Sequence, residues 1–586
     1  MRVLLLHPED LPWSGEWAHT PWDLIVDLGF AGPTIYSDWS QRLRARVISI
    51  HQFAGEMESY RWIDQVLQPG RGRLIDRMGL DWWEIGAVWN YHELHAFYLL
   101  EALRSELGPT ATEWAATRPH ACSDLLGLRS GQTVRCFRPE PAGFMPSLWR
   151  MLSAARKLRA QQVAEIALDK WDPSYAMRHH FAKRMNCKDP VFLLPSPYSN
   201  VTRMVLAYAA QLPNRNFLLA TTRRSGRAGN LPSNVKSTTL AAYAVSKIET
   251  QSEIEELKEA WETFERTALD ETEELRTMRQ AGIWKHFPVR VENGLRLRDA
   301  WNSLMAHEPV TGVLCGDDLN HATRLPLILA KLRGLSAVYC NHGALDGGML
   351  FKQPYADAFL VKGEMERDYL LRARPLAADR IEIAAPADAP PASAGKNTNA
   401  ASGAVVLFSQ PYEVLGGRTA EIYRELLPPL SSIARRTGHK LIVKLHPFES
   451  EKARRKVIDS ILPAADREGV EIVSRMPARD LLGSAWCGVG VDSSVAVECV
   501  LEGVPYFLCG WLDCGGFGYV SQFARFGAGQ LLRSPKEIEL IPKMISDYRA
   551  DPAMQQHLSQ PVSSERLDEI MFGLARVPEH SVAVQR

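Results

Sequence analysis

Two hydrogen-bond donors follow a buried strand in the second half of the chain. The run Val443-Lys444-Leu445-His446-Pro447-Phe448 places Lys444 and His446 two residues apart, so both lie on the same side of an extended backbone. Pro447 ends the strand because it has no amide hydrogen for the sheet. Two donors at a strand end are suited to bind an anion such as a phosphate. A capping histidine beside a solvated lysine is the alternative explanation.

A second loop of this kind is Asp492-Ser493-Ser494. It ends an apolar strand at 486–491 and begins a helix that continues through Val500 and Leu501. Ser493 or Ser494 is the expected N-cap, and the free amides of a first helical turn can bind an anion. A helix cap without a ligand would have the same sequence.

A third loop, Ser409-Gln410-Pro411-Tyr412, follows the first strand of the same half. Gln410 and Tyr412 are types of residue that contact a base or a sugar, although a simple turn also explains them. In a parallel sheet the carboxyl ends of the strands meet at one edge, where open α/β folds bind ligands. The three loops are therefore expected to converge on one site.

Taken together, the three loops resemble the donor half of bacterial sialyltransferases and related capsule-sugar transferases of the GT-B fold. The resemblance covers about residues 403–530. It implies that His446, Ser493 and Ser494 hold the phosphate of a CMP-activated sugar, with Lys444 and Glu449 as neighbours.

In the first half, Asp317 and Asp318 follow the strand that ends at Cys315. Adjacent carboxylates repel each other, so one of the pair is expected to hold a proton more tightly and to suit a general base. Those sialyltransferases have two acidic residues and a glycine here, whose acid is the base; this chain has Leu319 in place of the glycine. The alternative is that either aspartate caps the next helix.

A further strand end carries Asn341-His342-Gly343, before the pair Gly347-Gly348. This segment resembles the His-Gly segment of polyol-phosphate polymerases of teichoic-acid synthesis, and the overall layout is similar to the non-hydrolysing UDP-N-acetylglucosamine 2-epimerases. His342 is thus a second candidate for the base or for a phosphate contact. The loop from Ser196 to Asn200 also follows a strand and is expected to line the acceptor side.

The elements that position these loops alternate between short apolar strands and helical patterns, as a parallel sheet covered by helices requires. The chain is predicted to be α/β and GT-B-like, with two Rossmann-like domains facing a cleft and extra N-terminal and helical segments. The predicted units are an acceptor-side domain at 1–385 with a divergent first ~180 residues, a linker at 386–403 rich in Ala, Pro, Ser and Gly, and a nucleotide-sugar-binding domain at 404–586. A charged stretch at 250–280 predicts one or two amphipathic helices.

Composition excludes several classes of function. Lys plus Arg and Asp plus Glu both number 68 among 586 residues, which gives no net charge to attract nucleic acid. No run of ~20 apolar residues predicts a membrane span, and the N-terminus does not read as a signal peptide. Nine scattered cysteines without a CxxC pair fit a reducing cytoplasm and argue against a structural metal.

The sequence thus predicts a cytoplasmic glycosyltransferase that needs neither a metal nor a cofactor. Its partners are a nucleotide-sugar donor, with a CMP-activated acidic sugar favoured, and a surface-polysaccharide or glycolipid acceptor, which leaves room for peripheral membrane contact. Asp318 leads Asp317 and His342 as the base. The alternatives are an epimerase of the UDP-N-acetylglucosamine type, a polyol-phosphate transferase and a non-catalytic assembly scaffold.

Overall fold

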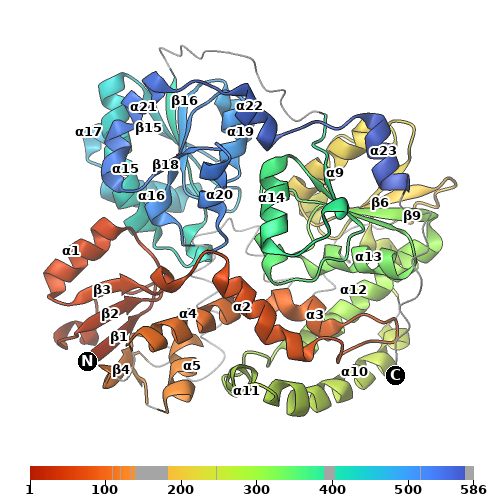
Figure 1. Ribbon diagram of the computed structural model, residues 1–586, viewed down its shortest axis with the longest axis horizontal. Helices are drawn as coiled ribbons and strands as arrows, with labels where there is room; N and C mark the ends of the chain where they lie inside the picture. Colours follow the sequence, from red (N-terminus) through yellow and green to blue (C-terminus); the bar gives the residue numbers. More distant parts are fainter. Residues whose placement is uncertain are drawn as a thin grey trace.

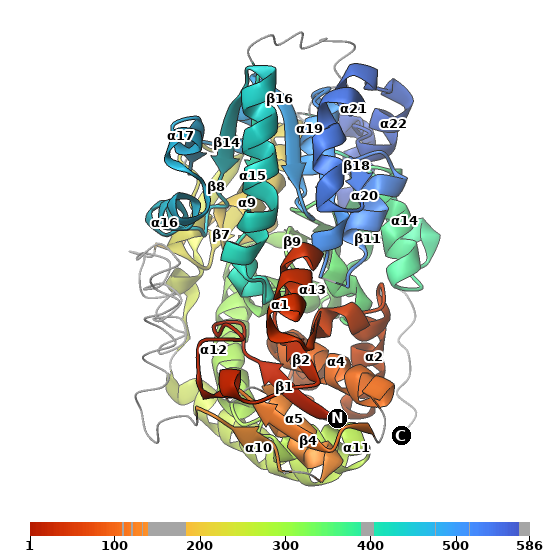
Figure 2. The same cartoon turned by 90° about the vertical axis from the view of Figure 1, so that its left-hand side faces the viewer.

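The computed structural model describes residues 1–107, 110–118, 121–131, 133–138, 183–245, 247–387, 403–474, 476–514 and 516–573. Of the predicted linker at 386–403, only residues 386, 387 and 403 belong to these ranges. Figure 1 shows three α/β units side by side, each built on its own sheet, and Figure 2 shows the same units from the side. Every pair of neighbouring strands within the three sheets is parallel.

The seven-stranded sheet forms the centre of the middle unit. Its strands are β6 (Val191–Ser196), β7 (Phe217–Thr221), β8 (Val235–Thr239), β9 (Val310–Cys315), β10 (Ser336–Cys340), β11 (Ala358–Val361) and β12 (Ile381–Ile383). The helices of this unit are α9 (Ser199–Gln211), α10 (Lys247–Thr267), α11 (Glu273–Gln280), α12 (Phe287–His307), α13 (His321–Leu332) and α14 (Glu364–Ala373).

The six-stranded sheet forms the C-terminal unit. Its strands are β13 (Ala404–Phe408), β14 (Lys440–Lys444), β15 (Val470–Val473), β16 (Ala485–Gly490), β17 (Tyr506–Cys509) and β18 (Gln530–Leu532). The helices in this part of the chain lie between these strands or after β18. They are α15 (Thr419–Thr437), α16 (Glu451–Ile461), α17 (Ala464–Arg467), α18 (Ala478–Leu482), α19 (Val495–Leu501), α20 (Tyr519–Arg525), α21 (Ile541–Asp547), α22 (Pro552–Leu558) and α23 (Ser564–Gly573).

Both sheets have the strand order of a Rossmann fold. The six-stranded sheet runs β15-β14-β13-β16-β17-β18, which is 3-2-1-4-5-6 in chain order, and the larger sheet adds one strand to the same order. The central strands of both sheets are apolar and nearly fully buried because helices cover both faces, whereas the edge strands β8, β15 and β18 include exposed residues. The predicted α/β class, with two Rossmann-like units of the GT-B type, is confirmed.

The first 138 residues form a third Rossmann-like unit, which the sequence had not predicted as a complete sheet. Its strands are β1 (Arg2–Leu6), β2 (Leu24–Asp27), β3 (Arg46–Ser49), β4 (Glu113–Ala116) and β5 (Arg135–Cys136), in the order β3-β2-β1-β4-β5. Its helices are α1 (Pro33–Leu43), α2 (Glu58–Leu67), α3 (Trp82–Gly86), α4 (Tyr91–Leu107) and α5 (Ala121–Ser130).

A residue of the C-terminal unit fills the crevice at the carboxyl edge of the five-stranded sheet. The Arg418 guanidinium is buried, forms an ion pair with Asp27 at 2.7 Å, and donates to the carbonyl oxygens of His7, Pro8 and Asp10 at 2.7 to 2.9 Å. Arg418 therefore joins the C-terminal unit to the carboxyl ends of β1 and β2.

The last described helix, α23, packs on the seven-stranded sheet and not on the unit that precedes it in the chain (Figure 1). Leu567, Ile570 and Met571 are buried among side chains of β6, β9 and β10, and Ser336 Oγ donates to Met571 O at 2.8 Å. The chain therefore passes from the middle unit to the C-terminal unit and back.

The charged stretch at 250–280 forms two helices, α10 and α11, of the amphipathic kind predicted. Ile254, Leu257, Trp261 and Phe264 of α10 are all buried. Its exposed glutamates are Glu255, Glu256, Glu259 and Glu262, whereas Glu253 is buried and pairs with Arg298. Among the residues described, every helix is too short or too polar to cross a bilayer.

Candidate functional site

A cleft of about 1030 Å³, open mouth included, lies between the seven-stranded and six-stranded units. Its walls begin where β10, β11 and β16 end, so the two sheets present their carboxyl edges to the same space. One wall is lined by Arg203, Met204, Ala207, His342, Gly343, Ala344, Lys362, Met365, Glu366 and Pro386. The other is lined by Arg479, Leu482, Ser494, Val497, Glu498, Leu501, Glu502, Leu558 and Ser559.

His342 enters the cleft from the loop after β10. Its Nδ1 lies 2.9 Å from the carbonyl oxygen of Gly316. Because a carbonyl only accepts, Nδ1 must carry the hydrogen, which leaves Nε2 with its lone pair. Lys362 holds this loop by donating to Asn341 O at 2.9 Å and to Gly343 O at 2.7 Å. The imidazole is therefore oriented with a free proton acceptor at Nε2.

Tyr198 lies between His342 and Asp317. Its hydroxyl donates to Asp317 Oδ2 at 2.5 Å, and the same oxygen is 3.5 Å from His342 Nε2. Burial, with the charge of Asp317, raises the pKa of Tyr198 above its usual value, so the phenol stays protonated. These three side chains come from loops that follow β6, β9 and β10, three neighbouring strands.

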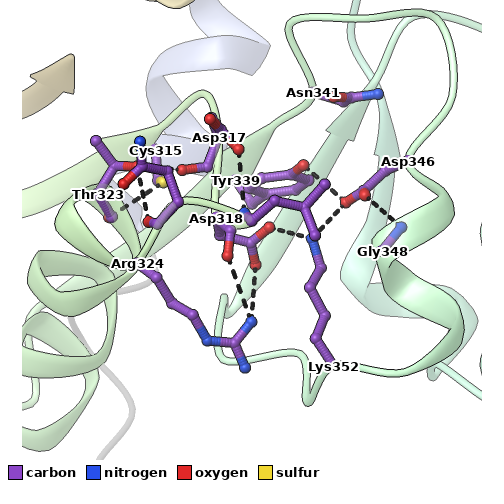
Figure 3. Close-up of polar contacts among 12 residues, drawn as sticks. Cys315, Asp317, Asp318, Thr323, Arg324, Tyr339, Asn341, Asp346, Gly348 and Lys352 are labelled. Carbon is purple, nitrogen blue, oxygen red and sulfur yellow. Dashed lines mark hydrogen bonds and ion pairs between the residues drawn. The ribbon is translucent and has the colours of Figure 1, made fainter. Parts of the chain in front are cut away.

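Asp318 does not contact this group through its carboxylate but belongs to a buried ionic network (Figure 3). It pairs with Lys352, whose ammonium also contacts Asp346 Oδ2 at 2.7 Å, and it lies 3.8 Å from Arg324. Asp318 is 1% exposed and Lys352 is fully buried. Burial raises the pKa of Asp318 while Lys352 opposes the shift. The two adjacent aspartates thus have different environments, and Asp318 lies outside the cleft lining.

Of the predicted serines, the structure places Ser494 in the cleft wall. Ser494 is the N-cap residue of α19, and its side chain makes no capping hydrogen bond. The hydroxyl of Ser493 accepts from the Val495 amide at 3.4 Å, which is a local turn contact. Ser494 therefore lies across the cleft from His342.

The Lys-x-His-Pro segment lies at the carboxyl end of β14, outside the lining of the cleft. His446 Nδ1 accepts from the Phe448 amide at 3.2 Å, so Nε2 carries the hydrogen and can donate. Burial, with a smaller effect of Lys444, lowers the pKa of His446 to about 4. The imidazole is consequently neutral near pH 7.

Glu449 holds the loop in place through hydrogen bonds. It is fully buried and accepts from Ser409 Oγ at 2.8 Å, from the His446 amide at 2.7 Å and from Arg454 Nε at 2.6 Å. With three donors already bound, it positions the loop and has little capacity left for a ligand.

Gln410 and Tyr412 lie at the carboxyl edge of the six-stranded sheet, together with Asp492. The Gln410 side chain hydrogen-bonds to Asp492. Gln410 Oε1, Tyr412 Oη and Asp492 Oδ1 are all buried, and none has a partner among the described residues. Buried polar atoms are normally paired, so this edge is suited to a ligand that brings hydroxyl or amino donors. Asp492 was missed as a site residue, although it stands directly between a buried strand and the two serines.

The loop from Ser196 to Asn200 contributes a different residue from those predicted. Ser196 is buried and shares a hydrogen bond of 2.5 Å with Thr202, and Asn200 is exposed. Neither lines the cleft. The sequence also gave no role to Lys362, Arg203, Arg479 or Glu498, whose positions in the cleft depend on how the two units pack.

The charges of the cleft include both signs. Glu498 lies near Arg203, which is on the opposite wall, and near Arg479, which is on its own wall. Burial raises the pKa of Glu498, and the two arginines oppose that shift. Within the described ranges no three His, Cys, Asp or Glu side chains are grouped so that they could hold a metal ion.

No family model and no curated protein matches the chain. Among solved structures, the UDP-GlcNAc 2-epimerase from Methanocaldococcus jannaschii shares 12% identity over 65% of this chain and 99% of its own, with a TM-score of 0.42. The calicheamicin glycosyltransferase CalG4 shares 13% over 66% and 94%, with a TM-score of 0.37. The wall teichoic acid polymerase TagF shares 10% over 74% and 98%, with a TM-score of 0.39. Likenesses at this level give no information on the reaction.

Proposed function

We propose that this protein is a glycosyltransferase that moves a sugar from a nucleotide donor to a hydroxyl group of an acceptor, with His342 as the general base. The observation that carries the proposal is the cleft between two Rossmann-like units with His342 Nε2 free on one wall and Ser494 on the other. Neutral imidazole is the side chain best suited to take a proton near pH 7.

In the proposed reaction His342 Nε2 removes the proton of the acceptor hydroxyl. The acceptor oxygen forms a bond to the anomeric carbon as the bond from that carbon to the phosphate oxygen breaks. The electron pair of the broken bond stays on the leaving phosphate. Hydrogen-bond donors aimed at such a developing charge usually supply the largest part of the stabilisation, and we assign this role to the Ser494 hydroxyl and to Nε2–H of His446.

We place the nucleotide on the six-stranded unit. The unpaired oxygens of Gln410 and Asp492, with the Tyr412 hydroxyl, offer acceptors for ribose hydroxyls or for the amino group of a base. The resemblance of the three loops to CMP-dependent transferases favours a CMP-activated acidic sugar, and Arg203 and Arg479 supply the positive charge that such a donor needs. A surface polysaccharide or a glycolipid is the proposed acceptor.

Transfer of a polyol phosphate is the second candidate. The observation in its favour is that Asp318 is tied to Lys352 while the histidine of Asn341-His342-Gly343 is free at Nε2. In that case the donor is a nucleoside diphosphate ester of the polyol. The acceptor oxygen attacks the phosphorus atom next to the polyol, and a nucleoside monophosphate leaves. An epimerase would bind a nucleotide sugar and turn it over without an acceptor.

The test is nucleotide binding by thermal shift and calorimetry with CMP, CDP, UDP and GDP. We expect CMP or CDP to stabilise the folded protein. Ser494→Ala and His446→Ala should each weaken binding by about tenfold, since each removes a hydrogen bond to a charged group. Ser493→Ala is the matched control, because Ser493 precedes Ser494 in the same turn but lies outside the cleft lining. A protein that binds none of the four nucleotides would contradict the proposal.

A further inference from the structure

We propose that Tyr198 and Asp317 form a positioning pair that stabilises His342 once it has accepted a proton. This inference rests on the proposed role of His342 as the base. It replaces the idea that Asp317 takes the proton itself with the idea that Asp317 acts through Tyr198.

The hydrogen-bond directions carry the inference. Tyr198 has one hydroxyl hydrogen, and Asp317 Oδ2 receives it at 2.5 Å. The phenol oxygen therefore turns its lone pairs toward His342 Nε2, at 3.5 Å. In the neutral imidazole, Nε2 also carries a lone pair, so the two atoms do not bond. When Nε2 gains a proton, the same contact becomes a hydrogen bond from a cation to an oxygen that is backed by a carboxylate.

Both carboxylate oxygens of Asp317 already accept a hydrogen bond. Its Oδ1 accepts from the Leu319 amide at 3.0 Å, its Oδ2 accepts from Tyr198, and the residue is 5% exposed. The carboxylate is thus fixed behind the phenol. An interaction that strengthens only when His342 is charged lowers the energy of the state in which the proton has moved, and this is how a group accelerates the chemical step.

Other charged groups near the cleft also affect the imidazole, but the substitutions do not change them, so they contribute equally in the variants and in the wild type. On the same wall Lys362 is neutralised by Glu366 at 2.8 Å. Further charges near the cleft or near Tyr198 come from Arg203, Arg223, Arg479, Glu498 and Glu502.

The experiment labels His342 with diethyl pyrocarbonate, which acylates unprotonated imidazole nitrogen, and needs no nucleotide. The rate of modification of the peptide that contains His342 is measured by mass spectrometry from pH 5 to pH 8. In Tyr198→Phe the pH of half-maximal labelling should fall by about one unit, which makes labelling about tenfold faster on the acid side of the curve. The plateau rate at alkaline pH should change little. Asp317→Asn should move the curve in the same direction.

Tyr243→Phe is the matched control. Tyr243 donates to Glu308 Oε1 at 2.5 Å, which is the same type of bond, but its hydroxyl contacts Glu308 and the Met185 amide rather than His342. Its labelling curve should coincide with that of the wild type. If Tyr198→Phe and Asp317→Asn both share that curve, or change the rate equally at every pH, the pair has only a structural role and the inference is overturned. Failure of nucleotide binding would leave these curves unaffected, so the two proposals fail separately.

Discussion

Asp317 and Asp318 are neighbours in the chain, but their side chains lie in different environments (Figure 3). Asp318 forms ion pairs with Lys352 and Arg324 inside the protein, whereas Asp317 lies beside the cleft and contacts Tyr198. In the proposed mechanism Asp317 therefore acts through Tyr198 on His342, whereas Asp318 stabilises the fold. Substitutions of the two aspartates can separate an effect on the reaction from an effect on stability.

The first residue to test is His342. Replacement by Asn keeps a polar side chain of similar reach but removes the proton acceptor. We expect kcat to fall by about 10² to 10⁴ while nucleotide affinity stays within a few fold, because a base acts in the chemical step. Initial rates of nucleotide release and calorimetry on the same preparation check this. Near-normal kcat in folded His342→Asn would rule out the histidine as the base.

Asp318→Asn should act on stability. The substitution leaves the buried Lys352 ammonium with only Asp346 as a full partner, and breaking a buried ion pair costs about 3 to 5 kcal/mol. Unfolding in urea measures the loss. Lys331→Met is the control, since its ion pair with Asp357 is partly exposed and should cost no more than about 1 kcal/mol. Equal stability of Asp318→Asn and wild type would show that the network contributes little.

Part of the site could be predicted from the sequence. His342 and Ser494 were predicted as candidates because a polar residue after an apolar strand marks the carboxyl edge of a parallel sheet, and both line the cleft. Tyr198 and Lys362 could not be assigned roles, because their partners, Asp317 and the carbonyls of the 341–343 loop, follow other strands. The position of Lys444 and His446 relative to the cleft depends on how the two units pack against each other. A local sequence pattern gives no information on that packing.

At the scale of elements, strands buried on both faces were the easiest to predict, since they read as continuous apolar runs. The strand predicted to end at Cys315 ends there (β9), and the strand predicted at 486–491 lies at Ala485–Gly490 (β16). The five-stranded sheet was harder to predict. Its strands β3 and β4 have four residues each, beginning with Arg46 and Glu113, and β5 has two. Runs this short and this polar do not stand out from loops.

Helix α23 offers a test at this scale. Met571→Ala or Leu567→Ala should destabilise the seven-stranded unit by about 2 to 5 kcal/mol, because each leaves a cavity under the sheet. Arg566→Ala, on the exposed side of the same helix, removes an ion pair with Glu382 and should cost about 1 kcal/mol or less. Denaturant unfolding compares the three. A small effect of Met571→Ala would mean that the returning helix is not part of the core.

The whole molecule is held together where the N-terminal unit meets the C-terminal unit. Tyr60 stacks on Phe517 at 4.0 Å and on His95 at 5.1 Å, and the Met57 amide donates to Gly516 O at 2.6 Å. His51 lies beside His95 at a centroid distance of 6.0 Å. Two imidazoles are thus packed among aromatic rings at the contact between the units.

This contact should weaken in acid. Burial lowers the pKa of His51 to about 4 and that of His95 to about 3, while the unfolded chain protonates near 6.5. The stability held by neutral imidazoles is present above pH 6.5 and is lost as the pH falls toward the folded values. At pH 5, about 1.5 units below 6.5, each histidine should cost up to about 2 kcal/mol.

Urea unfolding at pH 7 and pH 5 measures this loss. His95→Phe keeps a ring against Tyr60 and should reduce the difference between the two pH values by its own share, up to about 2 kcal/mol. The remainder comes from His51 and from His321 and His446, whose pKa burial also lowers to about 4. His19→Asn, at an exposed position, should leave the difference unchanged. The same pH dependence in His95→Phe and in wild type would show that acid acts elsewhere.

Arg418 also limits how the three units can move relative to one another. It ties the five-stranded unit to the C-terminal unit through Asp27, and Arg324 of the middle unit contacts Glu84 of the five-stranded unit at 3.1 Å. The middle and C-terminal units also contact each other directly, since Tyr369 Oη donates to Phe517 O at 2.8 Å, so each of the three units contacts the other two. A rotation of whole units that opened or shut the cleft would break one of these buried contacts, at a cost of several kcal/mol. We therefore expect loops and side chains around the cleft to provide the motion that domain closure provides in two-unit enzymes.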